Sequence, residues 1–491
     1  MPVKLLLVVS PYVFPQPNAL RSEHLGVLYL AASARKNGHE VKIFDPTLGH
    51  PTALRDGLFS FGAPEHEIAE TIRSFAPDVL GVSCHYSFSR QCAFNVVDLA
   101  KRLDARTATV MGGIVPSIHG RRVLDDCPSL DYALVGESER TLLDLLSFLS
   151  NRTPSLCDID GLLFRDEGDV ISNPKTHFIQ DLDSIPYPAR DLVDIHRYMN
   201  TGSRIFGLGN RPALSLLTSR SCPNHCSFCN MWMIHGRKWR MRSVDNVLGE
   251  IDEIVDKYHA EHIYVVDDSF TFNPSRTKVL LEQVIRKGYR IRWNTPNGIS
   301  VHGIDEELVQ LMKRSGCASV CLAIESGSEY IRNTVIGKRL PDEQIVKAVR
   351  LFQKAKIPTG GFLVLGMPGE DETHFRETLK LINRLPLSFV VAQFAIPFPG
   401  TKLYHDLVRM KVIEDGWEMR MDTLSRPAFA TRDFTLEDLV RRKRRLQFSF
   451  YLHHVPQMMR ELAGGRLYWL NLDSITQFLY STIRLKIEER L

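Results

Sequence analysis

The sequence predicts an α/β protein: a doubly wound, Rossmann-like parallel sheet comes first, a partial (β/α)6 barrel of the TIM type follows, and a helical region ends the chain. Two observations carry this prediction. Short apolar runs alternate with amphipathic helical stretches in the first 150 residues, and the same alternation returns between residues 212 and 403. Strands that alternate with helices favour parallel sheets whose faces are covered by those helices.

The first domain is expected over residues 1–150. Apolar runs predict the strands Val3–Val9, Val41–Phe44, Val79–Ser83, Thr107–Met111 and Tyr132–Val135. Helical periodicity predicts the helices Leu25–Asn37, Glu65–Phe75, Gln91–Leu103, Arg121–Asp126 and Ser138–Leu149. A doubly wound sheet binds its ligands at the carboxyl ends of its strands. The candidate binding residues that fall there are Ser10, Ser83, His85, Gly112, Gly113, Ile114, Gly136 and Glu137.

Residues 151–211 are expected to be a linker, in which Gly161–Phe164 and Val170–Ser172 form a β-hairpin. The barrel is expected over residues 212–403. Its predicted strands are Pro212–Thr218, His262–Asp267, Arg290–Asn294, Ser319–Ile324, Phe362–Leu365 and Phe389–Phe394. Its predicted helices are Val244–Lys257, Arg276–Lys287, Asp305–Arg314, Asp342–Lys354 and Thr373–Leu385. Functional groups of such a barrel gather at the carboxyl ends of the strands.

Three cysteines, Cys222, Cys226 and Cys229, lie on one short loop directly after the first barrel strand. Thiols at this spacing can hold one iron–sulfur cube, whose fourth iron then has no protein ligand. A disulfide is disfavoured because the chain shows no secretory signal. Zinc is the stronger alternative, and it needs a fourth ligand. The candidates, none of which gives a familiar zinc-finger spacing, are His225, His235, Cys317 and Cys321.

Polar residues close two further barrel strands. Asp267 and Asp268 follow the second strand, where paired carboxylates can receive an ammonium group or ribose hydroxyls. The alternative is that they cap the helix that starts near Asn273, and for Asp268 the two interpretations carry equal weight. Glu325 and Ser326 close the fourth strand, where a carboxylate and a hydroxyl suit a ribose.

Composition narrows the class of protein. The 491 residues are 44% hydrophobic and 24% charged, which is ordinary for a globular protein of two or three domains. A net charge of +4 argues against nucleic acid as the main partner. No apolar run reaches bilayer-spanning length, so a cytoplasmic location is expected. Six further cysteines are expected to be reduced core thiols: Cys84, Cys92, Cys127, Cys157, Cys317 and Cys321.

The three-cysteine pattern, with Phe228 directly before the third cysteine, resembles the signature of radical S-adenosylmethionine (SAM) enzymes. The resemblance implies a [4Fe-4S] cluster on the three cysteines, SAM on the open iron, and Phe228 against the adenine. It extends the SAM site to Asp267, Asp268, Glu325, Ser326, Gly361 and Gly366, the last two from a glycine-rich fifth strand and its turn. Arg240 and Arg242 can meet the methionine carboxylate or, as slightly favoured, only hold the loop at the surface.

A Gly112-Gly113 turn and a later Gly136-Glu137 turn, placed before the cysteine motif, resemble the cobalamin-binding domain of one large branch of these enzymes. The resemblance implies cobalamin contacts at the strand ends given above. Many cobalamin proteins supply an axial histidine from an Asp-x-His-x-x-Gly loop, which this chain lacks. His24 comes nearest, with the wrong spacing, and His85 and His119 are the other candidates, so the lower axial ligand is left open.

Together, these resemblances imply a cobalamin-dependent radical SAM enzyme. The commonest activity of the branch is methyl transfer from SAM, via methylcobalamin, to an unactivated carbon or a phosphorus after hydrogen abstraction by the 5′-deoxyadenosyl radical. An oxidative cyclase or ring-rearranging enzyme is the first alternative, and a zinc-holding binding protein is a distant second. The expected partners are a small-molecule substrate and an electron donor such as flavodoxin or ferredoxin. No catalytic protein side chain is assigned.

The region 404–491 is expected to be helical. Asp433–Arg445 predicts a helix with a basic end, followed by Leu446–Leu452 and by Leu467–Leu491, which has apolar residues at helical spacing. Packing against the core and a solvated basic face are the favoured interpretation. A site for a hydrophobic substrate or an anionic membrane surface is the alternative.

Overall fold

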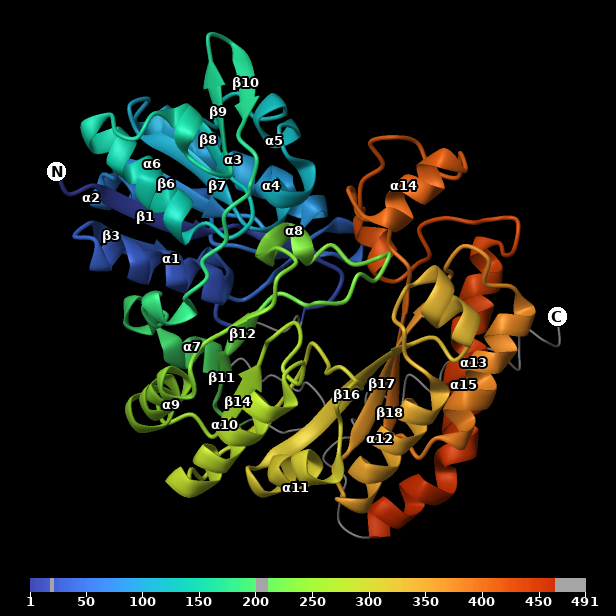
Figure 1. Cartoon of the computed structure of the whole chain (residues 1–491). Coiled ribbons are helices and arrows are strands. Elements are labelled where there is room, and N and C mark those ends of the chain that lie inside the picture. Colours follow the sequence, from blue (N-terminus) through green and yellow to red (C-terminus); the bar gives the residue numbers. More distant parts are fainter. Residues whose placement is uncertain (18–21, 200–210, 464–491) are drawn as a thin grey trace. The chain divides into compact units, whose positions relative to one another are not determined.

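The structure is a computed structural model that describes residues 1–17, 22–199 and 211–463. The chain forms two compact units (Figure 1). Unit 1 comprises Met1–Thr201, Asn230–Ser243 and Glu418–Met421, and unit 2 comprises Gly202–Cys229, Val244–Trp417 and Asp422–Leu491. The short piece Asn230–Ser243, which directly follows the three cysteines, thus packs with the N-terminal unit.

Unit 1 is built on a seven-stranded sheet in the order β10-β9-β8-β7-β6-β1-β3. Its strands are β1 Lys4–Val9, β3 Glu40–Phe44, β6 Val79–Ser83, β7 Ala108–Gly112, β8 Tyr132–Leu134, β9 Leu162–Asp166 and β10 Asp169–Ser172. Its main helices are α1 Leu25–Lys36, α2 Glu65–Phe75, α3 Arg90–Leu103, α4 Ile114–His119, α5 Arg122–Asp125 and α6 Glu139–Asn151. The first five of these strands pair in parallel, as predicted.

Helices cover both faces of this sheet. One hydrophobic core joins it to α2, α3, α4 and α5, and a second core joins the other face to α1 and α6. From β1 the chain moves to β3 on one side and then to β6 on the other, so the strand order reverses between β1 and β6. This reversal is the switch point at which doubly wound sheets open a crevice for ligands.

Two features of unit 1 differ from the expectation. The predicted hairpin does not lie in a linker, because β9 pairs antiparallel with β8 and extends the sheet. A small sheet in the order β2-β5-β4 was not predicted. Its strands, β2 Tyr12–Phe14, β4 Thr52–Ala53 and β5 Phe59–Phe61, are too short for a periodicity signal.

Unit 2 contains a six-stranded sheet in which strands adjacent in sequence are adjacent in space, in the order β11-β14-β15-β16-β17-β18. The strands are β11 Ala213–Leu216, β14 His262–Val265, β15 Arg292–Asn294, β16 Cys317–Glu325, β17 Thr359–Leu365 and β18 Phe389–Phe394. The helices are α9 Val244–Asp252, α10 Pro274–Lys287, α11 Glu306–Arg314, α12 Asp342–Lys354, α13 Glu372–Arg384 and α14 Lys402–Arg409. All strand pairs are parallel, which confirms the partial (β/α)6 barrel.

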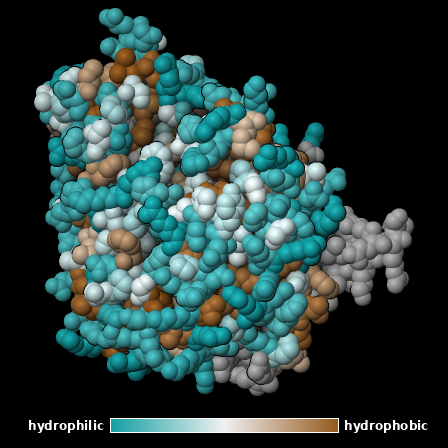
Figure 2. Space-filling model, turned by 45° about the vertical axis from the view of Figure 1, so that its right-hand side comes forward, coloured by the Kyte–Doolittle hydropathy of each residue, from teal (hydrophilic) through white to brown (hydrophobic). Residues whose placement is uncertain are grey.

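The C-terminal region is helical, as expected, but one helix, α15 (Leu436–Ala463), replaces the two predicted pieces. It buries Leu439, Leu446 and Phe450 at helical spacing and packs beside α13 (Figure 1). The predicted segment Leu467–Leu491 lies outside the described residues. Hydrophilic side chains predominate on the face shown in Figure 2. Among the described residues, no helix is both long and apolar enough to cross a membrane.

Candidate functional site

The cysteine loop of unit 2 is held by its backbone. Cys222, Cys226 and Cys229 are half-buried and form no disulfide within the described part of the chain. Between them, Ser227 donates its N–H to the carbonyl of Ile336 at 2.9 Å, and its own carbonyl accepts the N–H of Leu403 at 2.8 Å. Burial raises the pKa of Cys222, and it raises that of Cys226 to about 12. The loop therefore presents three thiols from a fixed backbone.

A buried ion pair lies beside these thiols. Lys338 Nζ donates to Glu325 Oε1 at 2.7 Å, and both residues are buried. Burial disfavours the charge on Lys338, but attraction to Glu325 and to Cys226 outweighs it and raises the pKa of the lysine. Glu325 ends β16 with φ +67° next to a register shift, so a strained backbone aims its carboxylate. The sequence carried no signal for Lys338, because a lone lysine usually marks a solvated surface.

Lys338→Met is expected to make the midpoint potential of a bound [4Fe-4S] cluster more negative. A cluster with three thiolates carries net negative charge, and a nearby buried cation favours the more negative, reduced state. The expected shift is on the order of tens of millivolts, measured by redox titration with EPR detection. Lys338→Arg keeps the charge and is the matched control. An unchanged potential in Lys338→Met would limit Lys338 to holding Glu325.

The two aspartates after β14 have different surroundings. Asp267 accepts from the N–H and the hydroxyl of Thr218, both at 2.6 Å, and from the Ser219 hydroxyl at 2.5 Å. Its carboxylate thus fixes the strand end that leads into the cysteine loop. Asp268 accepts a backbone bond from Ser221, and burial, followed by the charge of Asp267, raises its pKa to about 7. The capping alternative is wrong, because Asn273 itself caps α10.

Of the other predicted SAM residues, three are buried in or directly after barrel strands and one lies in the cysteine loop. The Ser326 hydroxyl accepts the N–H of Ser328 at 3.2 Å and is fully buried. A Cβ on Gly361 would lie 3.0 Å from Ile324 Cδ1 in the sheet interior. Gly366, at φ +89°, donates its N–H to the buried Glu370 carboxylate at 2.5 Å. Phe228 is half-buried within the cysteine loop.

The predicted cobalamin residues of unit 1 do gather at one edge of its sheet. Ser10 N–H donates to the Ser83 carbonyl at 3.1 Å, which joins the ends of β1 and β6. Cys84 N–H donates to the Gly112 carbonyl at 2.9 Å, which joins β6 to β7. Gly113 has φ +102°, and a Cβ there would lie 2.7 Å from the Cys84 carbonyl oxygen. Ile114 then begins α4.

Gly113→Ala is expected to weaken cobalamin binding roughly tenfold, because the left-handed backbone and the Cys84 contact together cost about 1–3 kcal/mol unless the loop moves. Binding is measured by titration with hydroxocobalamin. Gly26→Ala, where a Cβ meets nothing within 4 Å, is the matched control and should bind normally. Equal affinity in the two variants would show that the turn lies away from the cobalamin.

Glu137 is occupied by a contact within unit 1. Its carboxylate accepts from Arg240 Nη1 at 2.7 Å, and both side chains are buried. Arg240 also donates to the carbonyls of Ile179 and His235, at 2.5 and 2.6 Å. Arg240 is therefore not a surface residue, although it does hold the segment after the cysteines. Gly136 lies in the same turn with φ +69° and donates its N–H to the Ser117 hydroxyl at 2.8 Å.

The next observations concern the state of the cysteines and the side chains that could hold a single metal ion. None of the nine cysteines, all of which lie among the described residues, forms a disulfide there. Cys157 is exposed in a short turn after α6, so its assignment to the core is wrong. Within residues 1–17, 22–199 and 211–463, no three His, Cys, Asp or Glu side chains are placed to hold one metal ion. Each thiolate of a [4Fe-4S] cube binds its own iron, so that finding does not bear on a cluster.

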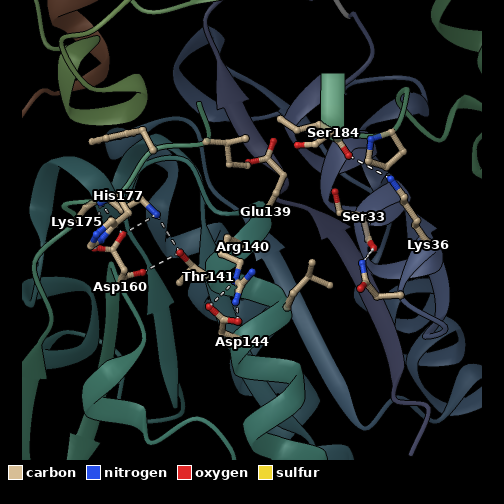
Figure 3. Close-up of a pocket in the computed structure, with 16 residues that line it drawn as sticks. Ser33, Lys36, Glu139, Arg140, Thr141, Asp144, Asp160, Lys175, His177 and Ser184 are labelled. Carbon is tan, nitrogen blue, oxygen red and sulfur yellow. Dashed lines mark hydrogen bonds and ion pairs between the residues drawn. The ribbon is translucent and has the colours of Figure 1, made fainter. Parts of the chain in front are cut away.

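A cavity of about 520 Å³ in unit 1 lies apart from these residues (Figure 3). It lies between the end of α1, the start of α6 and residues 175–186. Four of its charged groups form two ion pairs: Lys175 lies 3.1 Å from Asp160, and Arg140 lies 3.0 Å from Asp144 (Figure 3). The cavity contains none of the residues predicted to bind a cofactor.

Comparisons with known proteins match both units. The family profile of the Radical SAM superfamily matches residues 216–382, and that of the B12 binding domain matches residues 19–146. An uncharacterized methyltransferase of Pyrococcus horikoshii is 29% identical over 92% of this chain and 93% of its own length. The cytidylyl-2-hydroxyethylphosphonate methyltransferase of Streptomyces wedmorensis is 27% identical over 79% of this chain and 78% of its own length. The anaerobic magnesium-protoporphyrin IX monomethyl ester cyclase of Cereibacter sphaeroides is 24% identical over 80% and 63%.

Solved structures share the fold. TsrM of Kitasatospora setae, a radical SAM methyltransferase solved with cobalamin and a [4Fe-4S] cluster, superimposes with a TM-score of 0.66 at 19% identity, covering 84% of this chain and 75% of its own. OxsB, a cobalamin-dependent SAM radical enzyme, superimposes with a TM-score of 0.69 at 18% identity. The match covers 93% of this chain and 66% of OxsB. With both family profiles matched in the order that the sequence predicted, the chain belongs to the radical SAM enzymes that carry an N-terminal B12-binding domain.

Proposed function

We propose that the protein is a cobalamin-dependent radical SAM methyltransferase that methylates an unactivated carbon or a phosphorus of a small molecule. The observation that carries this proposal is that one chain joins a B12-binding sheet to a radical SAM barrel. The relatives that match this chain over most of their own length include methyltransferases. When bound, SAM supplies the methyl group and the hydrogen-abstracting radical, and cobalamin carries the methyl group between them and the substrate.

The residues of unit 2 fit a cluster and SAM. Cys222, Cys226 and Cys229 lie on a fixed loop and are not in disulfides, and the buried Lys338 offsets the charge that three thiolates bring. We assign these cysteines to the three ligated irons and Phe228 to the adenine. Asp268 is the carboxylate assigned to SAM itself, and Glu325, whose carboxylate Lys338 already binds, is assigned to positioning.

Other predicted SAM residues have a positioning role in this proposal. Asp267 holds Thr218 and Ser219 and so fixes the start of the loop. Ser326, Gly361 and Gly366 shape the strand ends beside it through buried hydrogen bonds and close packing.

The edge of unit 1 fits cobalamin because its turns carry glycines, which let the backbone approach a bulky ligand. A Cβ would collide with Cys84 at Gly113 and would crowd neighbouring carbonyls at Gly136, whereas at Gly112 it would meet nothing within 4 Å. The neighbouring strand ends contribute Ser10, Ser83, His85 and Ile114. Glu137 is assigned to positioning, since Arg240 already binds its carboxylate. Reduction of the cluster requires an electron donor, for which flavodoxin or ferredoxin is the chemical class proposed.

The experiment that tests this function is an anaerobic assay of the reconstituted protein with reductant and SAM, in which S-adenosylhomocysteine and 5′-deoxyadenosine are quantified. A methyltransferase is expected to release S-adenosylhomocysteine even without substrate. Deoxyadenosine alone, with cobalamin retained, would overturn methyl transfer. That outcome would favour the second candidate, an oxidative cyclase, which the similarity to the magnesium-protoporphyrin cyclase of Cereibacter sphaeroides supports.

A further inference from the structure

The segment between β16 and α12 brings several groups to the cysteine loop. Glu325 ends the strand, Lys338 binds its carboxylate from 13 residues further along the chain, and the Ile336 carbonyl accepts the Ser227 N–H at 2.9 Å. A short π-helix, Tyr330–Val335, lies in the middle of the segment. Helices of this kind are rare and are frequently found at functional sites. The place of the Lys338 ammonium therefore depends on how this one segment folds.

Arg332 lies within the π-helix, is fully buried, and joins the two ends of the segment. Its Nη1 donates to the Ser326 carbonyl at 2.7 Å, and its Nε donates to the Leu340 carbonyl at 2.6 Å. Ser326 directly follows Glu325, and Leu340 comes two residues after Lys338. The Arg332 carbonyl also accepts the N–H of Lys338 at 2.9 Å. One residue thus holds the backbone on both sides of the ion pair.

The charge of this guanidinium is balanced by carboxylates other than Glu325. Nη2 of Arg332 donates to Asp342 Oδ1 at 2.7 Å and to Glu329 Oε1 at 3.4 Å. Asp342 is the first residue of α12, so this contact also joins the segment to a helix. Donation to two carbonyls and two carboxylates at once requires the planar fork of a guanidinium, which an ammonium group cannot reproduce.

The position of the Lys338 ammonium matters because Glu325 neutralises it at longer range. The effect of such a pair on a third charge depends on which of its two members lies nearer, since the Coulomb energy falls with distance. At Cys226, burial of the thiol has the largest influence and raises the pKa to about 12, and Lys338 lowers that pKa more than Glu325 raises it. A small displacement of the ammonium would change this balance.

We propose that Arg332 is a positioning residue, which fixes the Lys338 ammonium beside the cysteine thiols and thereby sets the reduction potential of the cluster that they hold. A cation held close to the cluster favours its more negative, reduced state. Loosening the segment moves the ammonium away and makes reduction harder. This inference rests on the cluster of the proposed function and does not depend on methyl transfer.

The test compares the midpoint potential of the cluster in the reconstituted full-length protein and in Arg332→Lys, by redox titration with EPR detection. Arg332→Lys keeps a positive charge but loses the fork. Its potential is expected to be more negative than that of the wild type, by less than in Lys338→Met. Added to Lys338→Met, it is expected to change nothing further, because the charge that it positions is gone. No shift in the single variant, or equal shifts in both backgrounds, would overturn the proposal.

Arg384→Lys is the matched control. Arg384 also binds Asp342, at 3.1 Å, but it is half-exposed and lies on α13. Its variant is expected to keep the wild-type potential, and a shift as large as that of Arg332→Lys would overturn the assignment to Arg332.

A second variant covers the case in which Arg332→Lys takes up no iron. Asp342→Glu keeps every charge and lengthens one partner of the fork, so a smaller shift in the same direction is expected, and an unchanged potential would overturn the proposal. A wild-type protein without any cluster signal would overturn this inference together with the cluster assignment. Deoxyadenosine formation without methyl transfer would contradict only the proposed methyltransferase activity.

Discussion

Cys226→Ser is expected to abolish reductive SAM cleavage, with 5′-deoxyadenosine formation falling at least a thousandfold, to background. Cys226 is the middle cysteine of the loop, burial raises its pKa to about 12, and a serine hydroxyl is a poor iron ligand at neutral pH. Iron and sulfide after reconstitution, together with 5′-deoxyadenosine release, measure the effect. Cobalamin binding should persist, because its predicted contacts lie in unit 1.

Cys157→Ser is the matched control for this experiment. Cys157 is also a free cysteine, but it is exposed and lies in unit 1. Full iron content and full SAM cleavage are expected. If Cys226→Ser retained a complete cluster with normal turnover, the assignment of the loop to iron would fail.

Asp267→Ala is expected to destabilise the protein by about 3 kcal/mol and to reduce cluster content. The substitution removes the acceptor of three short hydrogen bonds from Thr218 and Ser219, all within the buried interior. It also leaves the buried guanidinium of Arg276, which donates to Thr218 Oγ1 at 2.9 Å, without the nearby carboxylate. Urea denaturation of the apo protein measures the loss.

Asp256→Ala is the control for Asp267→Ala, because Asp256 is exposed on the helix after α9 and should change stability by no more than about 0.5 kcal/mol. An Asp267→Ala protein of normal stability that has lost only SAM affinity would show that Asp267 binds the ligand directly, as the sequence first suggested. That result would return Asp267 to the binding site.

Local sequence patterns were sufficient to predict the large parallel sheet of each unit. Strands such as Val79–Ser83 and Phe389–Phe394, and the helix Asp342–Lys354, have the predicted bounds, because their apolar spacing is a property of neighbouring residues. The three-cysteine loop was visible for the same reason, since its thiols are seven residues apart at most. Short elements such as β2, β4 and β5 escaped because a few residues carry no period.

Side-chain roles needed the tertiary structure. Lys338 and Glu325 meet only because the chain turns back after β16, and Glu137 meets Arg240 across 103 residues of sequence. The carboxylate of Asp267 was expected to face a ligand, yet it faces the hydroxyls of Thr218 and Ser219, which follow β11. A residue type and its position at a strand end do not determine which partner its side chain finds.

The sequence by itself therefore determined the order of the two folds and the short loop that brings three cysteines together. These depend on periodicity and on spacing along the chain. The tertiary structure decided which charged side chains are paired and which glycines admit no side chain. Those properties depend on contacts between residues distant in sequence, and only folding brings such residues together.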